Sequence, residues 1–426
     1  MNKPKQENLF SLMDDRKNFL NVGVKYVSKI NNAKRLIKEK KVKSCKKSFT
    51  NKIHCIMYMI LCIIIIILLC IIFLGKNKDI YSVYPEAEDF LYVNTSELDE
   101  PKSLFILKED HTEIKDKNKI RICYCIDGGL IYPTLVSMTS ALENNDKEKN
   151  VIIFYLFVPH NFDKRNVEVF DSLKKKYFVK IHYYMIPPRF NRLRKWTSGT
   201  ATIYFKLYIP LILPHLERIL YLDGDTLVYQ DLSELFNMDF NGNYAMGYPF
   251  HGVGMMDKWG IKLVNYINGG VILFNIKEII KDNKDVELLS FSLKNNGRLY
   301  FLEQDALNIV FYNRTGLLPL KYGIYLFGNI TTYRNTVKKT LRVELNETEL
   351  IEALEKPALL HFAGCWPKIW TDKKYKNCFG DTSVCFRPHK DFYFYANKTD
   401  YAEKIMKIYL SKKKVGYLNY ILIYNS

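Results

Sequence analysis

Residues 218–225 read RILYLDGD, and this short stretch decides how the rest of the chain is interpreted. Its apolar part, Arg218–Leu222, predicts a buried strand that ends in two carboxylates, Asp223 and Asp225. In strand geometry both side chains would point to the same face, and two such charges repel unless a cation lies between them. Carboxylate oxygens suit manganese or magnesium, and Gly224 has no Cβ, so backbone or ligand could approach closely there. Taken alone, the pattern also fits an Asp-Gly turn or a calcium loop.

On both sides of this stretch, segments with the period of strands alternate with segments with the spacing of helices. Strands are predicted at Lys119–Cys125, Val151–Phe157, Val179–Met185, Arg218–Leu222, Tyr244–Gly247, Gly270–Asn275 and Ala358–Phe362. Helices are predicted at Pro133–Glu143, Asn166–Lys176, Thr202–Leu213 and Phe301–Tyr312, and the third is expected to break near Pro210 and Pro214. Such alternation implies an α/β fold with a mainly parallel sheet flanked by helices. Sheets of this kind bind ligands at the carboxyl ends of their strands.

A long uncharged stretch precedes the patterned region. Cys55–Leu74 reads CIMYMILCIIIIILLCIIFL, and twenty residues of helix span about 30 Å, the thickness of a hydrocarbon core. The alternative is a cleaved signal peptide, but its apolar part would be shorter, roughly 7–15 residues, and would end in small residues. We therefore expect a basic cytosolic tail at residues 1–54, a transmembrane signal-anchor helix at 55–74 and a stem at 75–117, with the remainder lumenal as in a type II membrane protein.

The formal net charge of +18 raises the question of a nucleic-acid partner. The excess is partly local, because Lys34–Lys52 holds nine basic residues and one acidic residue, whereas Lys76–Glu100 holds two basic and seven acidic ones. None of the short nucleic-acid signatures is present, so no nucleic-acid partner is expected. Sequons for N-glycosylation all follow the apolar stretch, in agreement with a lumenal domain, at Asn94, Asn313, Asn329, Asn346 and Asn397.

The cysteines place few further constraints on the fold. Cys123 and Cys125 point the same way from one predicted strand and are expected in the apolar core. Cys378 and Cys385 lie in a loop-like stretch and could form a small disulfide loop in an oxidising compartment. No paired CxxC pattern is present, so a zinc site is not expected.

Five blocks in a fixed order resemble glycosyltransferase family 8, which includes glycogenin and bacterial lipopolysaccharide galactosyl- and glucosyltransferases. They read ICYCIDGGLIYPTLVSMTSAL, TIYFKLYIPLILPHLERILYLDGDTLVYQDL, INGGVILFNI, LEQDALN and HFAGCWPKIW, and the resemblance covers roughly residues 119–372. It implies a catalytic domain of the GT-A fold, which we place at residues 118–385. Residues 386–426 lie outside the resemblance and are interpreted as a C-terminal extension that packs on this domain. It also implies transfer of sugar from a nucleotide diphosphate sugar, with retention of anomeric configuration. Together with the expected lumenal topology, this predicts a glycan, glycoprotein or glycolipid acceptor in the Golgi or endoplasmic reticulum.

The resemblance assigns roles to individual residues. The expected ligands of a manganese or magnesium ion are Asp223, Asp225 and His361. Residues expected to face the donor sugar and acceptor are Asn268, Gln304 and Asp305. Residues expected to contact the nucleotide diphosphate are Cys125, Ile126, Asp127, Tyr204, Lys206, Gly224, Gly364 and Lys368, with Tyr204 stacking on the uracil ring. Without the resemblance, a histidine after a short apolar run is more often a structural one. No carboxylate nucleophile is assigned, and attack by the acceptor on the front face of the donor is the alternative to a covalent intermediate.

The chain also departs from the family pattern. Lys206 stands where the family usually has arginine, which keeps the charge but loses bidentate geometry. Gly128 and Gly129 follow the first aspartate, where a second polar residue is usual, and no aspartate lies near Tyr248–Phe250. These departures leave UDP-glucose, UDP-galactose and UDP-xylose open as donors. A catalytically inactive relative acting as a membrane-tethered binding protein, and a calcium-binding or lectin-like domain, are the competing hypotheses.

Overall fold

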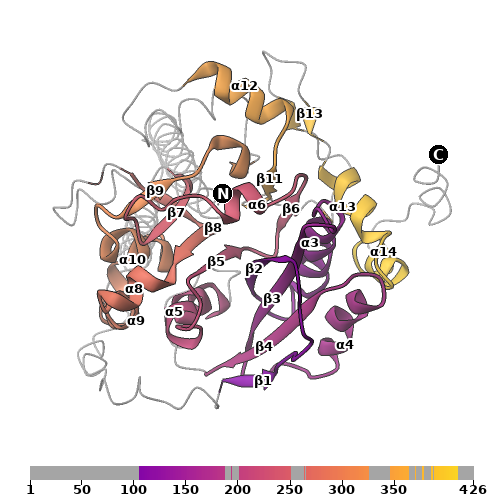
Figure 1. The fold of residues 1–426 in the computed structure, drawn as a ribbon, viewed down its shortest axis with the longest axis horizontal. Coiled ribbons are helices and arrows are strands. Elements are labelled where there is room, and N and C mark those ends of the chain that lie inside the picture. The colour runs from indigo at the N-terminus through magenta and orange to yellow at the C-terminus, as the bar shows by residue number, and fades with distance from the viewer. Residues whose placement is uncertain are drawn as a thin grey trace, which may run out of the picture. The chain divides into compact units, whose positions relative to one another are not determined.

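The structure, a computed structural model, describes residues 105–187, 201–250, 265–325, 346–363 and 388–410, together with a few positions between these ranges, namely 193, 263, 370, 377–378 and 385–386. All of them belong to one compact unit (Figure 1). Among these residues no helix is both long and apolar enough to cross a bilayer. The predicted anchor, Cys55–Leu74, lies outside the described residues.

An eight-stranded sheet forms the centre of this unit, with strands in the order β1-β4-β3-β2-β5-β8-β7-β9. Its strands are β1 (Ile106–Lys108), β2 (Asn118–Cys125), β3 (Asn150–Pro159), β4 (Lys180–Ile186), β5 (Arg218–Leu222), β7 (Ala245–Pro249), β8 (Ile267–Asn275) and β9 (Thr315–Leu317). The strands β4, β3, β2 and β5 pair in parallel, as do β7 and β9. The strand β8 runs antiparallel to β5 and β7, and β1 runs antiparallel to β4. The predicted mainly parallel α/β fold is thus confirmed.

Helices cover the sheet on both sides (Figure 1). They are α3 (Ile131–Glu143), α4 (Asn166–Asp171), α5 (Ile209–Ile212), α6 (Ser233–Phe236), α8 (Ile276–Lys281), α9 (Lys284–Lys294), α10 (Glu303–Val310), α12 (Glu347–Glu355), α13 (Pro388–Ala396) and α14 (Ala402–Leu410). Short 3-10 helices are η4 (Ser172–Lys175), η6 (Ala201–Tyr208), η8 (Asn296–Arg298) and η9 (Leu320–Tyr322). The predicted helix Thr202–Leu213 is therefore divided into η6 and α5, and Pro210 lies in the first turn of α5, where its missing N–H costs no helical hydrogen bond.

The strand β2 shows why the sheet is buried on both faces. Ile122 and Tyr124 pack into the apolar core beneath α3, α4 and α13, whereas Cys123 and Cys125 pack into the core beneath η6, α5 and α10. Successive side chains of a strand point to opposite faces, so a continuous apolar run supplies both cores at once. The prediction that both cysteines are core residues is confirmed, and burial raises the pKa of the Cys123 thiol.

The strand that follows the Asp-Gly-Asp motif belongs to a second, three-stranded sheet. Its strand order is β10 (Ile324–Tyr325), β11 (Leu359–His361) and β6 (Thr226–Val228). β11 runs antiparallel to β6, with His361 opposite Thr226. The backbone N–H of Phe362 also donates to the carbonyl oxygen of Asp225 at 2.8 Å. This pairing brings a residue from late in the chain to the turn that follows β5.

Elements at the two ends of the described region add to the predicted fold. The strand β1 lies within the segment expected to be a stem, where sequence periodicity indicates no strand. After residue 385, α13 packs against α3, and the Tyr393 hydroxyl donates to the carbonyl oxygen of Trp370 at 2.8 Å. Just before α13 in the chain, β12 (Asn377–Cys378) pairs antiparallel with β13 (Cys385–Phe386), with Cys378 opposite Cys385. The disulfide between these cysteines stays a prediction.

Candidate active site

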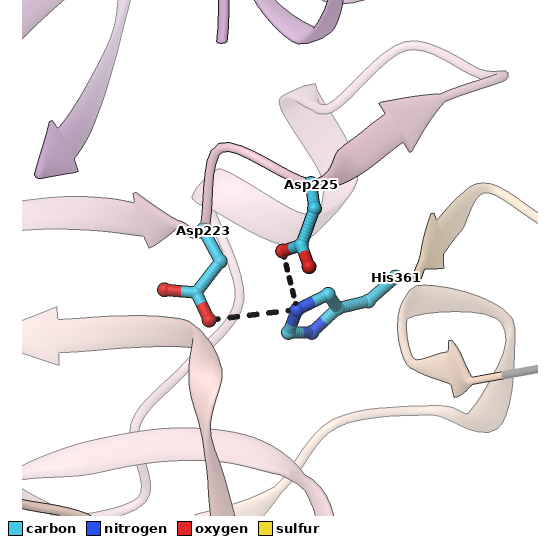
Figure 2. Close-up of side chains that lie close together, drawn as sticks. All are labelled: Asp223, Asp225 and His361. Carbon is cyan, nitrogen blue, oxygen red and sulfur yellow. Dashed lines mark hydrogen bonds and ion pairs between the residues drawn. The ribbon is translucent and has the colours of Figure 1, made fainter. Parts of the chain in front are cut away.

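Three potential metal ligands meet where β5 ends (Figure 2). Asp223 follows β5, Asp225 precedes β6, and His361 ends β11, so the turn and the neighbouring strand supply all three. The His361 Nε2 atom lies 2.9 Å from Asp225 Oδ1 and 3.4 Å from Asp223 Oδ2. One ligand atom from each residue lies within 4.8 Å of the other two. Two carboxylate oxygens and an imidazole nitrogen form a donor set that fits manganese or magnesium.

The protonation of His361 agrees with this role. Its side chain is 1% exposed, and burial lowers its pKa to about 4, although the carboxylates of Asp225 and Asp223 favour the charged form. The imidazole is therefore neutral at physiological pH and has a lone pair to offer a cation. The Asp223 and Asp225 carboxylates are more accessible, at 28% and 11% exposure, so the cluster opens toward solvent on its acidic side.

Two glycines make room for the cluster. A Cβ on Gly270 would overlap the His361 ring and lie 2.5 Å from Asp223 Oδ2, and the Gly270 carbonyl accepts a hydrogen bond from the Asp223 backbone N–H at 2.8 Å. A Cβ on Gly224 would overlap the hydroxyl of Thr134 in α3. The close approach expected at Gly224 is therefore a contact with protein, since α3 packs directly on the turn.

Replacing Gly270 by alanine is expected to disturb the cluster without unfolding the domain. The added methyl group must displace either His361 or Asp223, and overpacking of this kind costs about 1–3 kcal/mol. We expect the free energy of unfolding to fall by that amount and manganese affinity to fall at least about tenfold. Gly297→Ala is the control, because a Cβ there meets nothing within 4 Å. Unchanged manganese affinity in Gly270→Ala, measured by calorimetry, would contradict this packing argument.

Lys206 lies directly beneath the acidic cluster. Its Nζ donates to the Gly269 carbonyl at 2.7 Å and to Glu303 Oε1 at 3.1 Å, and lies 3.7 Å from Asp223 Oδ1. The ammonium also lies over the ring of Tyr221, 4.6 Å from its centroid. Lys206 is 2% exposed, and although burial opposes its charge, Asp223 and Glu303 more than offset this and raise its pKa. Lys206 thus joins β5, β8 and α10 rather than facing outward to a diphosphate.

The three residues expected beside the donor sugar form one buried network. Gln304 Oε1 accepts from the side chain of Asn268 at 2.9 Å and from the backbone of Gly269 at 2.8 Å. Gln304 Nε2 donates to the Tyr266 hydroxyl, which donates to Asp305 Oδ1. Asn268, Gln304 and Asp305 are each 0% exposed. The structure brings the three residues together, and their hydrogen bonds join α10 to β8. Their expected place beside the donor sugar stays a prediction.

The residues expected around the nucleotide base differ in how far the structure buries them. Asp127 is half-buried after β2, and its Oδ1 accepts from the backbone of Gly129 at 2.8 Å. Cys125 and Ile126 are buried in the apolar cores. Tyr204 is also completely buried, with its hydroxyl 3.4 Å from Asn296 Oδ1, so its ring is not presented for the expected stacking on uracil. Its place in η6 turns it into the core beneath the sheet. Gly364 and Lys368 lie outside the described residues.

Comparison with known proteins decides the family. The family model described as glycosyl transferase family 8 matches residues 121–374, more than half of the chain. The chain belongs to glycosyltransferase family 8. Members of this family transfer sugar from nucleotide sugars, and the match confirms the resemblance of the five sequence blocks.

Curated relatives agree with this assignment, and solved structures agree with the fold. A lipopolysaccharide 1,2-glucosyltransferase of Escherichia coli is 26% identical over 52% of this chain and 67% of its own length. A lipopolysaccharide 1,3-galactosyltransferase of Salmonella typhimurium is 27% identical over 51% of this chain and 66% of its own length. Among solved structures, the bifunctional glycosyltransferase WbbM aligns over 70% of this chain and 52% of its own, with 20% identity and a TM-score of 0.53. The galactosyltransferase LgtC aligns over 66% of this chain and 96% of its own, with 17% identity and a TM-score of 0.52. These structures show the GT-A type of fold.

Sequence reasoning missed three residues that shape this family 8 site. Gly270 makes room for the cluster, Glu303 pairs with Lys206, and the Tyr248 hydroxyl lies 3.2 Å from His361 Nδ1. The two consecutive glycines in an otherwise apolar strand, INGGVILF, were an available signal for close backbone approach. Nothing in the local sequence marks Glu303 or Tyr248, because their partners lie far away along the chain.

Proposed function

We propose that this chain is a retaining, metal-dependent glycosyltransferase that transfers a hexose or pentose from a UDP-sugar to a glycan, glycoprotein or glycolipid. The observation that carries the proposal is the meeting of Asp223, Asp225 and neutral His361 at the carboxyl end of β5. UDP-glucose, UDP-galactose and UDP-xylose are the candidate donors. The glucosyl- and galactosyltransferases among the relatives support a hexose donor.

The site residues have separate tasks in this proposal. Asp223, Asp225 and His361 would hold a manganese or magnesium ion, which offsets the negative charge that develops on the diphosphate as the sugar–phosphate bond breaks. Lys206 places a buried positive charge 3.7 Å from Asp223 and keeps that carboxylate in position. The network of Asn268, Gln304 and Asp305 holds the start of α10 rigidly beside the cluster.

We place the enzyme in the membrane of the Golgi or endoplasmic reticulum, with its catalytic domain in the lumen. The uncharged stretch Cys55–Leu74 and the basic residues before it support this topology. Three of the sequon asparagines, Asn313, Asn346 and Asn397, are exposed in the structure, where a glycan could be attached. Each belongs to the part of the chain that the topology makes lumenal.

Release of UDP tests the proposed activity. The purified full chain, kept in mild detergent because of its apolar stretch, is incubated with a panel of UDP-sugars in manganese and in EDTA. We expect release of UDP from one donor, lost in EDTA and restored by excess manganese. Release that is unaffected by EDTA would contradict the metal site. Absence of release, together with absence of UDP binding by calorimetry in manganese, would favour an inactive relative that acts as a binding protein.

A further inference from the structure

The second ring nitrogen of His361 has a partner that the metal cluster does not explain. While Nε2 faces the two aspartates, Nδ1 lies 3.2 Å from the hydroxyl of Tyr248, in hydrogen-bond range. Tyr248 lies in β7 and His361 in β11, 113 residues later in the chain. Both side chains are buried, at 0% and 1% exposure, so water does not compete for this bond.

The Tyr248 ring is held firmly in place. A Cβ on Gly323 would overlap the ring, so the glycine leaves a space that the ring fills. Gly270 allows β8 to approach the Cε1 and Nδ1 atoms of the His361 ring. The histidine ring is thus in close contact with both β8 and the Tyr248 hydroxyl, and its orientation toward the aspartates is set by the packing of three strands.

A phenol hydroxyl suits both protonation patterns of a neutral imidazole. When Nε2 carries the proton and donates to Asp225, Nδ1 accepts a hydrogen bond from the hydroxyl. When Nε2 offers its lone pair to a cation, the proton lies on Nδ1 and donates to the hydroxyl oxygen instead. A hydroxyl that rotates can serve both states without movement of either ring, which a carbonyl or an ammonium group cannot do.

We propose that Tyr248 is a positioning residue that holds His361 in the orientation and tautomer needed to bind a divalent cation; this inference rests on the metal site of the proposed function. Groups that hydrogen-bond the free nitrogen of a histidine ligand typically contribute 10–100-fold to metal affinity. The Tyr248 hydroxyl contacts Nδ1, whereas Nε2 is the ring nitrogen beside the aspartates, so Tyr248 acts on the histidine and is not itself placed among the ligands.

The test is a manganese titration of the full chain in the presence of UDP, followed by the electron paramagnetic resonance signal of free manganese. Tyr248→Phe keeps the ring and removes the hydroxyl, and we expect its Kd for manganese to be about 10–100-fold weaker. Tyr183→Phe is the matched control. This substitution also removes a buried hydroxyl, which donates to Asp171 Oδ1 at 2.8 Å and takes no part in the metal cluster. We expect the variant to be less stable than the wild type but to keep the wild-type Kd for manganese.

His361→Ala separates the two levels of the proposal. If manganese binding requires His361 but Tyr248→Phe binds as tightly as the wild type, the positioning role is wrong and the metal site stands. If the wild type and His361→Ala bind manganese equally, or neither binds it, the metal site is wrong and the role of Tyr248 is overturned with it. A weaker Kd in both tyrosine variants would show a general loss of stability, which also overturns the positioning role.

Discussion

Asp225→Asn is expected to lower kcat/KM for sugar transfer by about a hundred- to a thousand-fold. The substitution keeps the shape of the side chain but removes one of two negative charges from a cluster where His361 Nε2 lies 2.9 Å from Asp225 Oδ1. An amide is a poor ligand for manganese beside a carboxylate, and loss of a group that stabilises developing charge costs this much in other enzymes. Steady-state release of UDP at saturating manganese measures the effect.

Asp239→Asn is the matched control for this experiment. Asp239 is exposed, and its carboxylate accepts a local hydrogen bond from the backbone of Asn241. It does not belong to the group of potential metal ligands found among the described residues. We expect wild-type activity from this variant. If Asp225→Asn keeps more than about a tenth of wild-type activity while binding manganese normally, Asp225 is not a ligand and the proposed centre must be abandoned.

Lys206→Met is expected to lower the free energy of unfolding more than Gly270→Ala does. The lysine is 2% exposed and pairs with Glu303, which is 1% exposed, so its removal leaves a buried carboxylate without its cationic partner. Breaking a buried ion pair from one side typically costs about 3–5 kcal/mol. Asp223, 3.7 Å from the same ammonium, also loses its neighbouring positive charge, so manganese-dependent activity should fall as well. Chemical denaturation of the purified chain measures the loss of stability.

A double-mutant cycle separates the loss of the pair from the loss of packing. Lys206→Met combined with Glu303→Gln removes both charges, so the double variant should be more stable than Lys206→Met alone. Lys321→Met is the comparison at the surface, because Lys321 pairs with Glu234, whose side chain is 67% exposed. Loss of this pair should lower the free energy of unfolding by no more than about 1 kcal/mol. A double variant as unstable as Lys206→Met would show that methionine packing, not charge, is responsible.

Local sequence is sufficient to predict six of the eight strands of the large sheet, but not β1 or β9. Lys119–Cys125 is predicted as a strand and is part of β2, because a short apolar run that contains β-branched residues favours a buried strand over a helix. The carboxylates after β5 were found for a similar reason: an apolar strand that ends in Asp-Gly-Asp places charge at a sheet edge whatever the rest of the chain does. The break expected near Pro210 is found between Tyr208 and Ile209, where η6 ends and α5 begins. Local sequence does not indicate that Ala201–Tyr208 is a 3-10 helix, since a 3-10 helix and an α-helix share most of their sequence preferences.

The family 8 resemblance supplied what periodicity could not. By its local sequence alone His361 was more often a structural histidine, and only the order of the blocks assigned it to the metal. The same resemblance placed Tyr204 on the base, whereas the structure buries its ring completely. Resemblance assigns residue types to positions, but the direction of each side chain depends on how η6 packs in this particular chain.

Tertiary structure alone decided how the site is assembled. Asp225 and His361 are 136 residues apart, and they meet because β11 pairs with β6 in a register that places His361 opposite Thr226. Strand pairing over such separations depends on the packing of many distant segments at once, so no local pattern specifies it. The same holds for the hydrogen bond of Tyr248 to His361 and for the burial of Lys206 against Glu303. Short-range side-chain pattern thus determines the strand and its acidic end, while long-range strand register determines which histidine, lysine and tyrosine complete the site.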